Sequence, residues 1–313
     1  MLYGDCKERR AVKKLIYNER NFKTRDPFVT KHNGKYYHCF TMDTQTVYIA
    51  CADTVDGLAD AEAKLVYRPE EGKEYSKELW APELHIIDNK CYIYVACDDG
   101  KNMNHRMYVL ENNSDNPLVP YRMYGKITDS TDRWAIDATV MKYNDKMYFV
   151  WSGLEGEANV CQKLYIAEMK NPYELCSERV MISTPEQDWE LHGRTGLENS
   201  PHVNEGPIAC VIDGELYLFY SASGSGCDKY CIAYLKLTGS NPLDPKAWTK
   251  CKKPVFSSND MVKGGGHCSI VCDYDKKYVF FHGWDKEETE IKWDTVSIWY
   301  GELKNNNEKI IIE

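Results

Sequence analysis

Three carboxylates occupy equivalent places in a pattern that repeats along the chain. They are Asp26 in an Arg-Asp-Pro segment, Asp137 in a Trp-Ala-Ile-Asp segment and Glu205 in an Asn-Glu-Gly-Pro segment. Because repeated sequence implies repeated structure, residues far apart in the chain can converge on one axis. Carboxylates gathered in one place raise one another's pKa, which separates an acid from a base at neutral pH. The pattern therefore indicates acid/base chemistry at a shared site.

The repeat has five copies, each with an apolar run, an Asn/Asp/Gly-type turn and a second apolar run. Aligned on the turn, the copies begin at Asp26, Ala81, Asp137, Gly206 and His267. Their turns are followed by Lys35, Lys90, Lys146, Glu215 and Lys276, a spacing of roughly 55 to 70 residues. Two apolar runs about such a turn predict a β-hairpin. The spacing is typical of propellers, solenoids and arrays.

A further strand is expected after each hairpin, at residues 46–53, 106–113, 163–170, 231–238 and 296–303. Fourth strands are expected at residues 64–69, 124–129, 179–184 and 252–258, and residues 12–17 are a candidate for the outer strand of the last unit. We therefore predict one all-β domain over residues 1–313, a five-bladed β-propeller with four-stranded antiparallel blades around a central pocket. A β-sandwich would not produce five copies in register. The irregular stretches 186–203 and 285–294 are expected to be loops at the mouth.

The composition limits the classes of molecule that the protein is expected to bind. The net charge is −9 and no Lys/Arg-rich run occurs, which argues against nucleic acid. No apolar stretch is long enough to span a membrane. The 23 Tyr and 8 Trp suit strands and also sugar-binding clefts, so an oligosaccharide or polysaccharide is the expected partner. The sequence does not indicate an oligomeric state.

The cysteines and the first residues bear on location. There are 13 cysteines, an odd number, and several lie within strand-like apolar runs, so we expect reduced core thiols. The first ten residues are polar and charged and contain no apolar core of a signal peptide. Together these features predict a cytoplasmic location.

Six segments together resemble glycoside hydrolase family 43, and most closely its exo-acting α-L-arabinofuranosidases. They are residues 25–28, 79–83, 133–137, 203–207, 220–223 and 264–267. Each is short, but six in order at the spacing of the repeat are specific. The resemblance implies a five-bladed propeller and hydrolysis with inversion, with Asp26 as general base, Glu205 as general acid and Asp137 as the carboxylate that modulates and orients the acid. In such a mechanism the base and acid carboxyls stand about 6.5–9.5 Å apart.

The resemblance also implies residues that contact the sugar. They are Trp80, Glu83, Trp134, Ile136, His267 and Trp284. No cofactor is required, although His267 is a candidate contact, through water, for a structural Ca²⁺ or Na⁺ on the axis; a hard cation wants mainly oxygen ligands. Two positions depart from the family pattern: Ala138 stands where Gly is expected and would narrow the pocket, and Trp284 stands where Arg is frequent.

The sequence leaves alternative functions open. A β-D-xylosidase or an endo-arabinanase would use the same carboxylates, because arabinofuranose and xylopyranose present similar hydroxyl groups. The insert 186–203 favours a closed pocket and exo action. A non-catalytic propeller that binds carbohydrate or protein is disfavoured by the intact set of three carboxylates.

Overall fold

The computed structural model describes residues 12–15, 24–194, 196–306 and 309–313 and consists of strands joined by turns and loops. The predicted all-β class is confirmed. In the described ranges the helices are short 3₁₀ segments: η1 (Asp56–Ala59), η2 (Asn102–Asn104), η3 (Asp188–Glu190) and η4 (Pro245–Ala247). None of these has the length and apolar character that a membrane crossing by a helix requires.

Two four-stranded antiparallel sheets come first in the chain. The first contains β2 (Phe28–His32), β3 (Lys35–Met42), β4 (Thr46–Ala52) and β5 (Ala63–Tyr67). The second contains β6 (Lys77–Ile87), β7 (Lys90–Asp98), β8 (Arg106–Glu111) and β9 (Arg122–Ile127). Within each sheet, neighbours along the chain pair side by side.

A nine-stranded sheet follows, made of two antiparallel groups. The first group contains β10 (Ala135–Tyr143), β11 (Lys146–Leu154), β12 (Cys161–Asn171), β13 (Glu174–Leu175) and β14 (Val180–Ser183). The second contains β15 (His202–Ile212), β16 (Glu215–Ala222), β17 (Cys231–Leu237) and β18 (Trp248–Lys250). The two groups meet where β12 and β15 run parallel for two residues.

The last sheet joins the two ends of the described chain. It contains β19 (Val262–Asp273), β20 (Lys276–Asp285), β21 (Ser297–Asn306), β22 (Lys309–Ile312) and β1 (Lys13–Leu15). Strand β1 pairs with β21, as predicted for part of residues 12–17, while residues 16 and 17 lie outside the described residues. Strand β22 was not predicted; it pairs with β21 and makes this sheet five-stranded.

The predicted hairpins are confirmed. Each second strand begins at the expected residue after the turn, and the predicted third and first three fourth strands all coincide with observed strands. The fourth strand predicted at residues 252–258 is wrong, because β18 occupies that place instead. Pro254 has no N–H to donate, and only Phe256 makes an isolated bridge, to Ile232.

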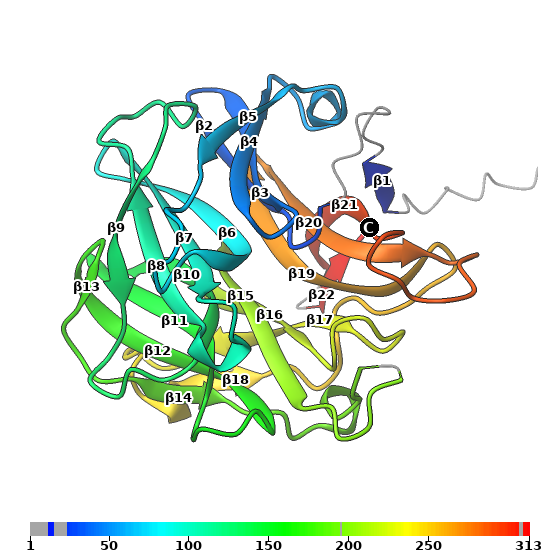
Figure 1. Ribbon diagram of the computed structural model, residues 1–313. Helices are drawn as coiled ribbons and strands as arrows, with labels where there is room; N and C mark the ends of the chain where they lie inside the picture. The colour runs from blue at the N-terminus through cyan, green and yellow to red at the C-terminus, as the bar shows by residue number, and fades with distance from the viewer. Residues whose placement is uncertain (1–11, 16–23, 195, 307–308) are drawn as a thin grey trace, which may run out of the picture.

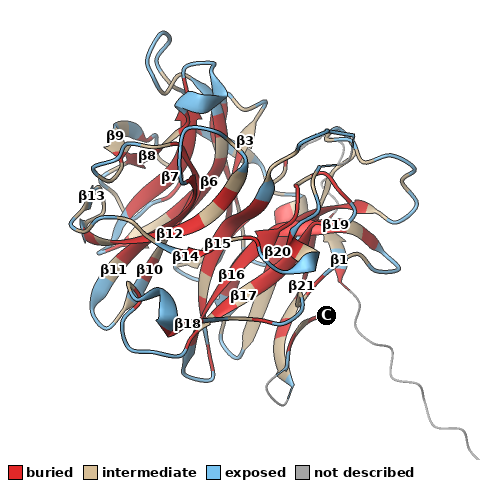
Figure 2. Ribbon diagram, turned by 90° about the horizontal axis from the view of Figure 1, so that it is seen from below, coloured by how far each residue is buried: buried red, intermediate tan, exposed pale blue. Residues whose placement is uncertain are grey.

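The first strands of the five repeats contact one another in a ring. Strand β2 contacts β6, β6 contacts β10, β10 contacts β15, β15 contacts β19, and β19 contacts β2 again. In Figure 1, β6, β10, β15 and β19 lie near the middle of the molecule and β9, β13 and β14 near its periphery. Figure 2 shows that the strands are largely buried while the connecting turns are exposed.

The five residues that open the repeats share an unusual backbone conformation. All have a φ angle in the left-handed region: 52° at Asp26, 43° at Ala81, 55° at Asp137, 56° at Gly206 and 50° at His267. In four of the five copies the pairing register also shifts at this point. A bulge turns a side chain out of the regular alternation, and strained residues of this kind gather at functional sites. The repeat thus places one strained residue per copy at the start of each first strand.

Candidate active site

Three of the residues that open the repeats, Asp26, Asp137 and His267, line a pocket of about 300 Å³. In the other two copies the residue directly before the opening position, Trp80 or Glu205, lines it instead. It is lined by the predicted residues Asp26, Trp80, Trp134, Ile136, Asp137, Glu205 and His267. Other lining residues, which the sequence did not single out as sugar contacts, are Arg25, Asn102, Asn159, Gln162, Arg194, Leu197, Ser200, Pro201, Val203, Gly224, Ser225 and Trp293. Glu83 and Trp284 do not line it. The volume suits a single small ligand.

Asp26 lies among basic groups. Its Oδ1 is 3.0 Å from Nδ1 of His282 and 3.2 Å from Nδ1 of His267, and its Oδ2 is 3.5 Å from Nε of Arg25. Burial works to raise the pKa of Asp26, but His267, His282 and Arg25 outweigh it and hold that pKa well below its ordinary value. Asp26 is therefore ionised at neutral pH, the state that a general base needs.

Glu205 shows the opposite behaviour. Burial and the charge of Asp26 raise the pKa of Glu205 to about 7, against the lowering effects of Arg25 and of a 2.8 Å hydrogen bond donated by the Tyr230 hydroxyl. A carboxyl group with this pKa can deliver a proton near neutral pH. The ring of Tyr230 reaches Glu205 because residue 266 is glycine: a Cβ on Gly266 would lie 2.1 Å from that ring.

Asp137 completes the group of carboxylates. Burial, Glu205 and Asp26 all raise its pKa well above the ordinary value. Ligand atoms of Asp137, Glu205 and His267 lie within 4.8 Å of one another. Burial lowers the pKa of His267 to about 4, so its imidazole is neutral at pH 7. Two buried carboxyls this close do not both ionise easily, and the pair retains a proton at neutral pH.

The same three residues are a poor fit for a resident hard cation. Ca²⁺ takes six to eight oxygen ligands, whereas the cluster offers two carboxyl groups and one imidazole, whose Nδ1 already faces Asp26.

Two tryptophans form part of the wall. Nε1 of Trp80 donates to Oε2 of Glu78 at 3.0 Å, and its ring lies 4.0 Å from the His105 ring, centroid to centroid. Nε1 of Trp134 donates to the carbonyl oxygen of Asn102 at 2.9 Å. Both indoles are thus held by their polar edge, which leaves ring surface toward the pocket. Such a surface suits the apolar face of a sugar.

Two of the predicted positions lie behind the pocket. Glu83 is buried, its Oε2 lies 2.8 Å from Nε2 of His85, and burial raises its pKa. It braces the wall near Asp137, whose pKa its charge helps to raise, and does not contact the pocket. Ala138 packs in the hydrophobic core beside Phe149 and Ala167, so its Cβ does not narrow the pocket as expected.

Trp284 is fully buried, contrary to the expectation that it contacts the sugar. Its Nε1 donates to the carbonyl oxygen of Lys292 at 2.6 Å, and its ring packs 5.2 Å from that of Trp293. Trp284 therefore supports the loop between β20 and β21, and Trp293 of that loop lines the pocket. Guanidinium carbons of Arg25 and Arg194 lie 4.7 Å and 5.6 Å from the Trp293 ring centroid. The only sequence signal for Trp293 is a lone aromatic residue in a charged loop.

The irregular insert 186–203 forms another wall, as expected of a loop at the mouth. Arg194, Leu197, Ser200 and Pro201 line the pocket from it. The backbone N–H of Arg194 donates to Oγ of Ser200 at 2.8 Å, and the N–H of Gly224 donates to the carbonyl oxygen of His192 at 2.7 Å. The insert is therefore fastened to itself and to the end of β16.

Comparison with known proteins agrees with this geometry. The model of glycosyl hydrolases family 43 matches residues 20–296. The chain belongs to this family. Over 256 residues it is 32% identical to an extracellular exo-α-(1→5)-L-arabinofuranosidase of Streptomyces chartreusis. The matched region covers 79% of this chain and 76% of the relative. It is 34% identical to α-L-arabinofuranosidase 43 of Humicola insolens over 80% of this chain but only 52% of the relative.

A solved structure is similar over nearly the whole chain. The α-L-arabinofuranosidase of Lactobacillus brevis superimposes with a TM-score of 0.83 at 30% identity, and the match covers 94% of each chain. The resemblance drawn from six short segments is thus confirmed.

The predicted cytoplasmic location is contradicted. The Streptomyces relative is named as extracellular. The cysteines in the described ranges are all free, in line with the expected thiols, but core thiols behave as small apolar side chains and do not indicate a compartment.

Proposed function

We propose that this family 43 enzyme is an exo-acting α-L-arabinofuranosidase that releases terminal α-L-arabinofuranosyl residues from arabinan or arabinose-containing oligosaccharides. The observation that carries the proposal is the division of the buried carboxylates: the pKa of Asp26 is depressed while that of Glu205 is raised to about 7. Glycoside hydrolysis needs one ionised and one protonated carboxyl on opposite sides of the scissile bond. The names of the relatives supply the sugar.

Each carboxyl has one role in this mechanism. Glu205 protonates the leaving oxygen, and Asp26 takes a proton from the water that attacks C1 from the opposite face, so that the product has inverted configuration. Asp137 has a ligand atom within 4.8 Å of one of Glu205, its own pKa is raised by Glu205, and it orients the acid as part of a pair that retains a proton. Trp80, Trp134, Ile136 and His267 contact the terminal sugar from the wall.

We further propose that residues 1–313 form one five-bladed propeller, with the pocket at the end where the five innermost strands begin. The closed ring of contacts among β2, β6, β10, β15 and β19 supports this arrangement. The walls from residues 186–203 and from the β20–β21 loop favour a pocket that accepts a chain end. An endo-arabinanase would need an open groove instead.

No step of the mechanism involves a metal. A Ca²⁺ or Na⁺ ion reached by His267 through water stays a prediction, to be tested by metal analysis of the purified protein. Substrate choice is tested with 4-nitrophenyl α-L-arabinofuranoside, 4-nitrophenyl β-D-xyloside and linear arabinan, with the products sized. The proposal expects turnover of the arabinofuranoside and release of arabinose alone from arabinan. Preferred turnover of the xyloside, or early release of oligosaccharides, would contradict it. Proton NMR during turnover should detect β-arabinose first.

A further inference from the structure

A second buried glutamate lies outside the pocket, on the insert that forms its wall. Glu190 in η3 has no exposed surface. Its Oε1 accepts from Nδ2 of Asn204 at 2.9 Å and from the Tyr220 hydroxyl at 3.0 Å, and its Oε2 accepts from the backbone N–H of Glu186 and of Gln187, both at 2.9 Å. A carboxylate with this many donors is fully satisfied away from water.

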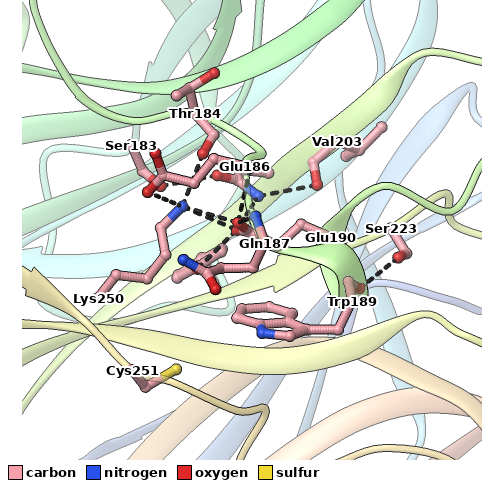
Figure 3. Close-up of polar contacts among 12 residues, drawn as sticks. Ser183, Thr184, Glu186, Gln187, Trp189, Glu190, Val203, Ser223, Lys250 and Cys251 are labelled. Atoms are coloured by element: carbon pink, nitrogen blue, oxygen red, sulfur yellow. Dashed lines mark hydrogen bonds and ion pairs between the residues drawn. The ribbon is translucent and has the colours of Figure 1, made fainter.

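Lys250 of β18 supplies the compensating charge. Its Nζ lies 2.9 Å from Oε2 and 3.1 Å from Oε1 of Glu190, and it also donates to the carbonyl oxygen of Thr184 at 2.7 Å. Figure 3 shows the ammonium group between Thr184 and the Glu190 carboxylate. Burial works to raise the pKa of Glu190, but the backbone N–H groups and Lys250 outweigh it and leave that pKa below its ordinary value. The pair is therefore ionic.

The ion pair fixes the start of the insert against the sheet. Next to Glu190, the carbonyl oxygen of Trp189 accepts a 2.9 Å hydrogen bond from Oγ of Ser223, as Figure 3 also shows. The chain then continues to Arg194 and Ser200, which line the pocket. Loss of the pair would free the element from which this wall extends.

The pair also reaches the strand that carries the acid. Asn204 is fully buried and directly precedes Glu205. Besides its bond to Glu190, its Oδ1 accepts from Oγ of Ser183 at 2.8 Å and its carbonyl oxygen accepts from Oγ of Ser152 at 2.9 Å. Successive side chains of a strand point to opposite faces, so Asn204 is held from behind while Glu205 faces the pocket. The bulge between Glu205 and Ile208 makes this stretch irregular and dependent on such support.

We infer that Glu190 and Lys250 are positioning residues for the reaction: through Asn204 they fix the acid Glu205, and through the insert they fix the pocket wall. This inference rests on the proposed function. Neither residue contacts the substrate. Their effect must therefore appear in the step that needs the proton of Glu205, which separates positioning from a general loss of stability.

The test compares Glu190→Gln with the wild type on two arabinofuranosides. Arabinobiose has a poor leaving group, a sugar hydroxyl, which needs protonation to depart. The leaving group of 2,4-dinitrophenyl α-L-arabinofuranoside is dinitrophenolate, which departs without protonation. General acid catalysis contributes about 10²–10⁴-fold, so a displaced acid should lower kcat on arabinobiose by about tenfold to a hundredfold. The loss on the dinitrophenyl substrate should stay below about threefold. Equal losses on both substrates, or no loss on either, would overturn the inference.

Asn204→Ala provides the second variant, because it removes the link and leaves Glu190 paired with Lys250. It should produce the same split between substrates, and the double variant should lose no more than either single one, as expected for residues that act in series. If Glu190→Gln does not fold, Asn204→Ala alone decides, and the absence of a split contradicts the inference.

The matched control is Glu111→Gln. Glu111 is also a buried carboxylate paired with a cation, Arg122 at 2.5 Å, but it lies on β8 opposite Tyr92, near the turn end of β7. Its loss should leave the ratio between the two substrates unchanged; a similar split in this variant would count against the inference. If the wild type cleaves neither substrate, the proposed function fails; if it cleaves both and the variants do not separate them, only the inference fails.

Discussion

Glu190 and Glu205 lie close together in the same part of the molecule, and both are removed from water, yet burial has opposite outcomes for them. Glu190 accepts hydrogen bonds from two backbone N–H groups, an amide, a hydroxyl and an ammonium group, and its pKa falls. Among the residues that the structure describes, Glu205 accepts a side-chain hydrogen bond from Tyr230 alone, it faces other carboxyls, and its pKa rises to about 7. Donors around a buried carboxyl, more than burial itself, decide whether it holds its charge or its proton.

The comparison separates a structural from a catalytic use of the same side chain. Glu190 is satisfied and fixed, whereas Glu205 is under-satisfied and reactive. Asn204 connects the two, because it is bonded to the first and adjacent in sequence to the second.

The largest effect is expected for Glu205→Gln. The amide cannot donate the proton, so kcat/KM on arabinobiose should fall by about 10²–10⁴-fold. Activity on the dinitrophenyl arabinofuranoside should largely survive. In the control, Asp26→Asn, both substrates should lose activity because the attacking water still needs its base. Full activity of Glu205→Gln on arabinobiose would contradict the assignment of the acid.

Lys250→Met should lower the free energy of unfolding and not the catalytic rate alone. The substitution leaves the Glu190 carboxylate buried without its counter-charge, and breaking one partner of such a pair costs about 3–5 kcal/mol in the free energy of unfolding. Chemical denaturation of the variant and the wild type measures this change in the free energy of unfolding. The double variant Glu190→Gln, Lys250→Met should recover a large part of the loss. If the single variant unfolds like the wild type, the ion pair contributes nothing to the fold.

Trp293→Ala should weaken substrate binding at the mouth. The ring lines the pocket beside Arg25 and Arg194, and loss of an aromatic contact of this kind corresponds to about a tenfold rise in KM for arabino-oligosaccharides. The control is Tyr274→Ala, whose side chain is 97% exposed at the turn between β19 and β20 and should leave KM unchanged. Equal KM values for both variants would show that Trp293 does not contribute to substrate binding.

The smallest effect is expected for Tyr230→Phe. The hydroxyl favours the ionised form of Glu205, so its removal should raise the pKa of the acid by up to about one unit. An inverting enzyme needs the acid protonated, and the alkaline limb of the pH–rate profile should therefore move to higher pH. A shift to lower pH would show that Tyr230 acts in another way.

The repeat made much of the fold predictable. Lys35, Lys90, Lys146, Glu215 and Lys276 each begin a strand, because the turn chemistry before them fixes the hairpin locally. The fourth strand of the fourth unit was misplaced by a run of apolar residues around Pro254, where the missing N–H moves the pairing to Trp248–Lys250. Strand β22 has no copy in the other units, so the repeat could not reveal it.

The site was predictable only where the motif repeats. Asp26 and Asp137 occupy in-register positions and Glu205 directly precedes one, Gly206, so the three carboxylates converge. Trp293, in contrast, reaches the pocket through a loop conformation set by the contact of Trp284 with Lys292. Glu190 likewise depends on partners from β15, β16 and β18 that no local pattern reveals. Local signals specify the strands; tertiary contacts specify the loops.

The role of Glu205 as the general acid is tested most directly by the pH dependence of kcat/KM for the wild type on the two arabinofuranosides. Activity on arabinobiose should fall as the pH rises through about 7, where Glu205 loses its proton, while Asp26 remains ionised far below that pH. The dinitrophenyl substrate, which needs no proton, should lack this alkaline limb. A limb at the same pH with both substrates, or with neither, would contradict the claim that a protonated Glu205 drives departure of the leaving group.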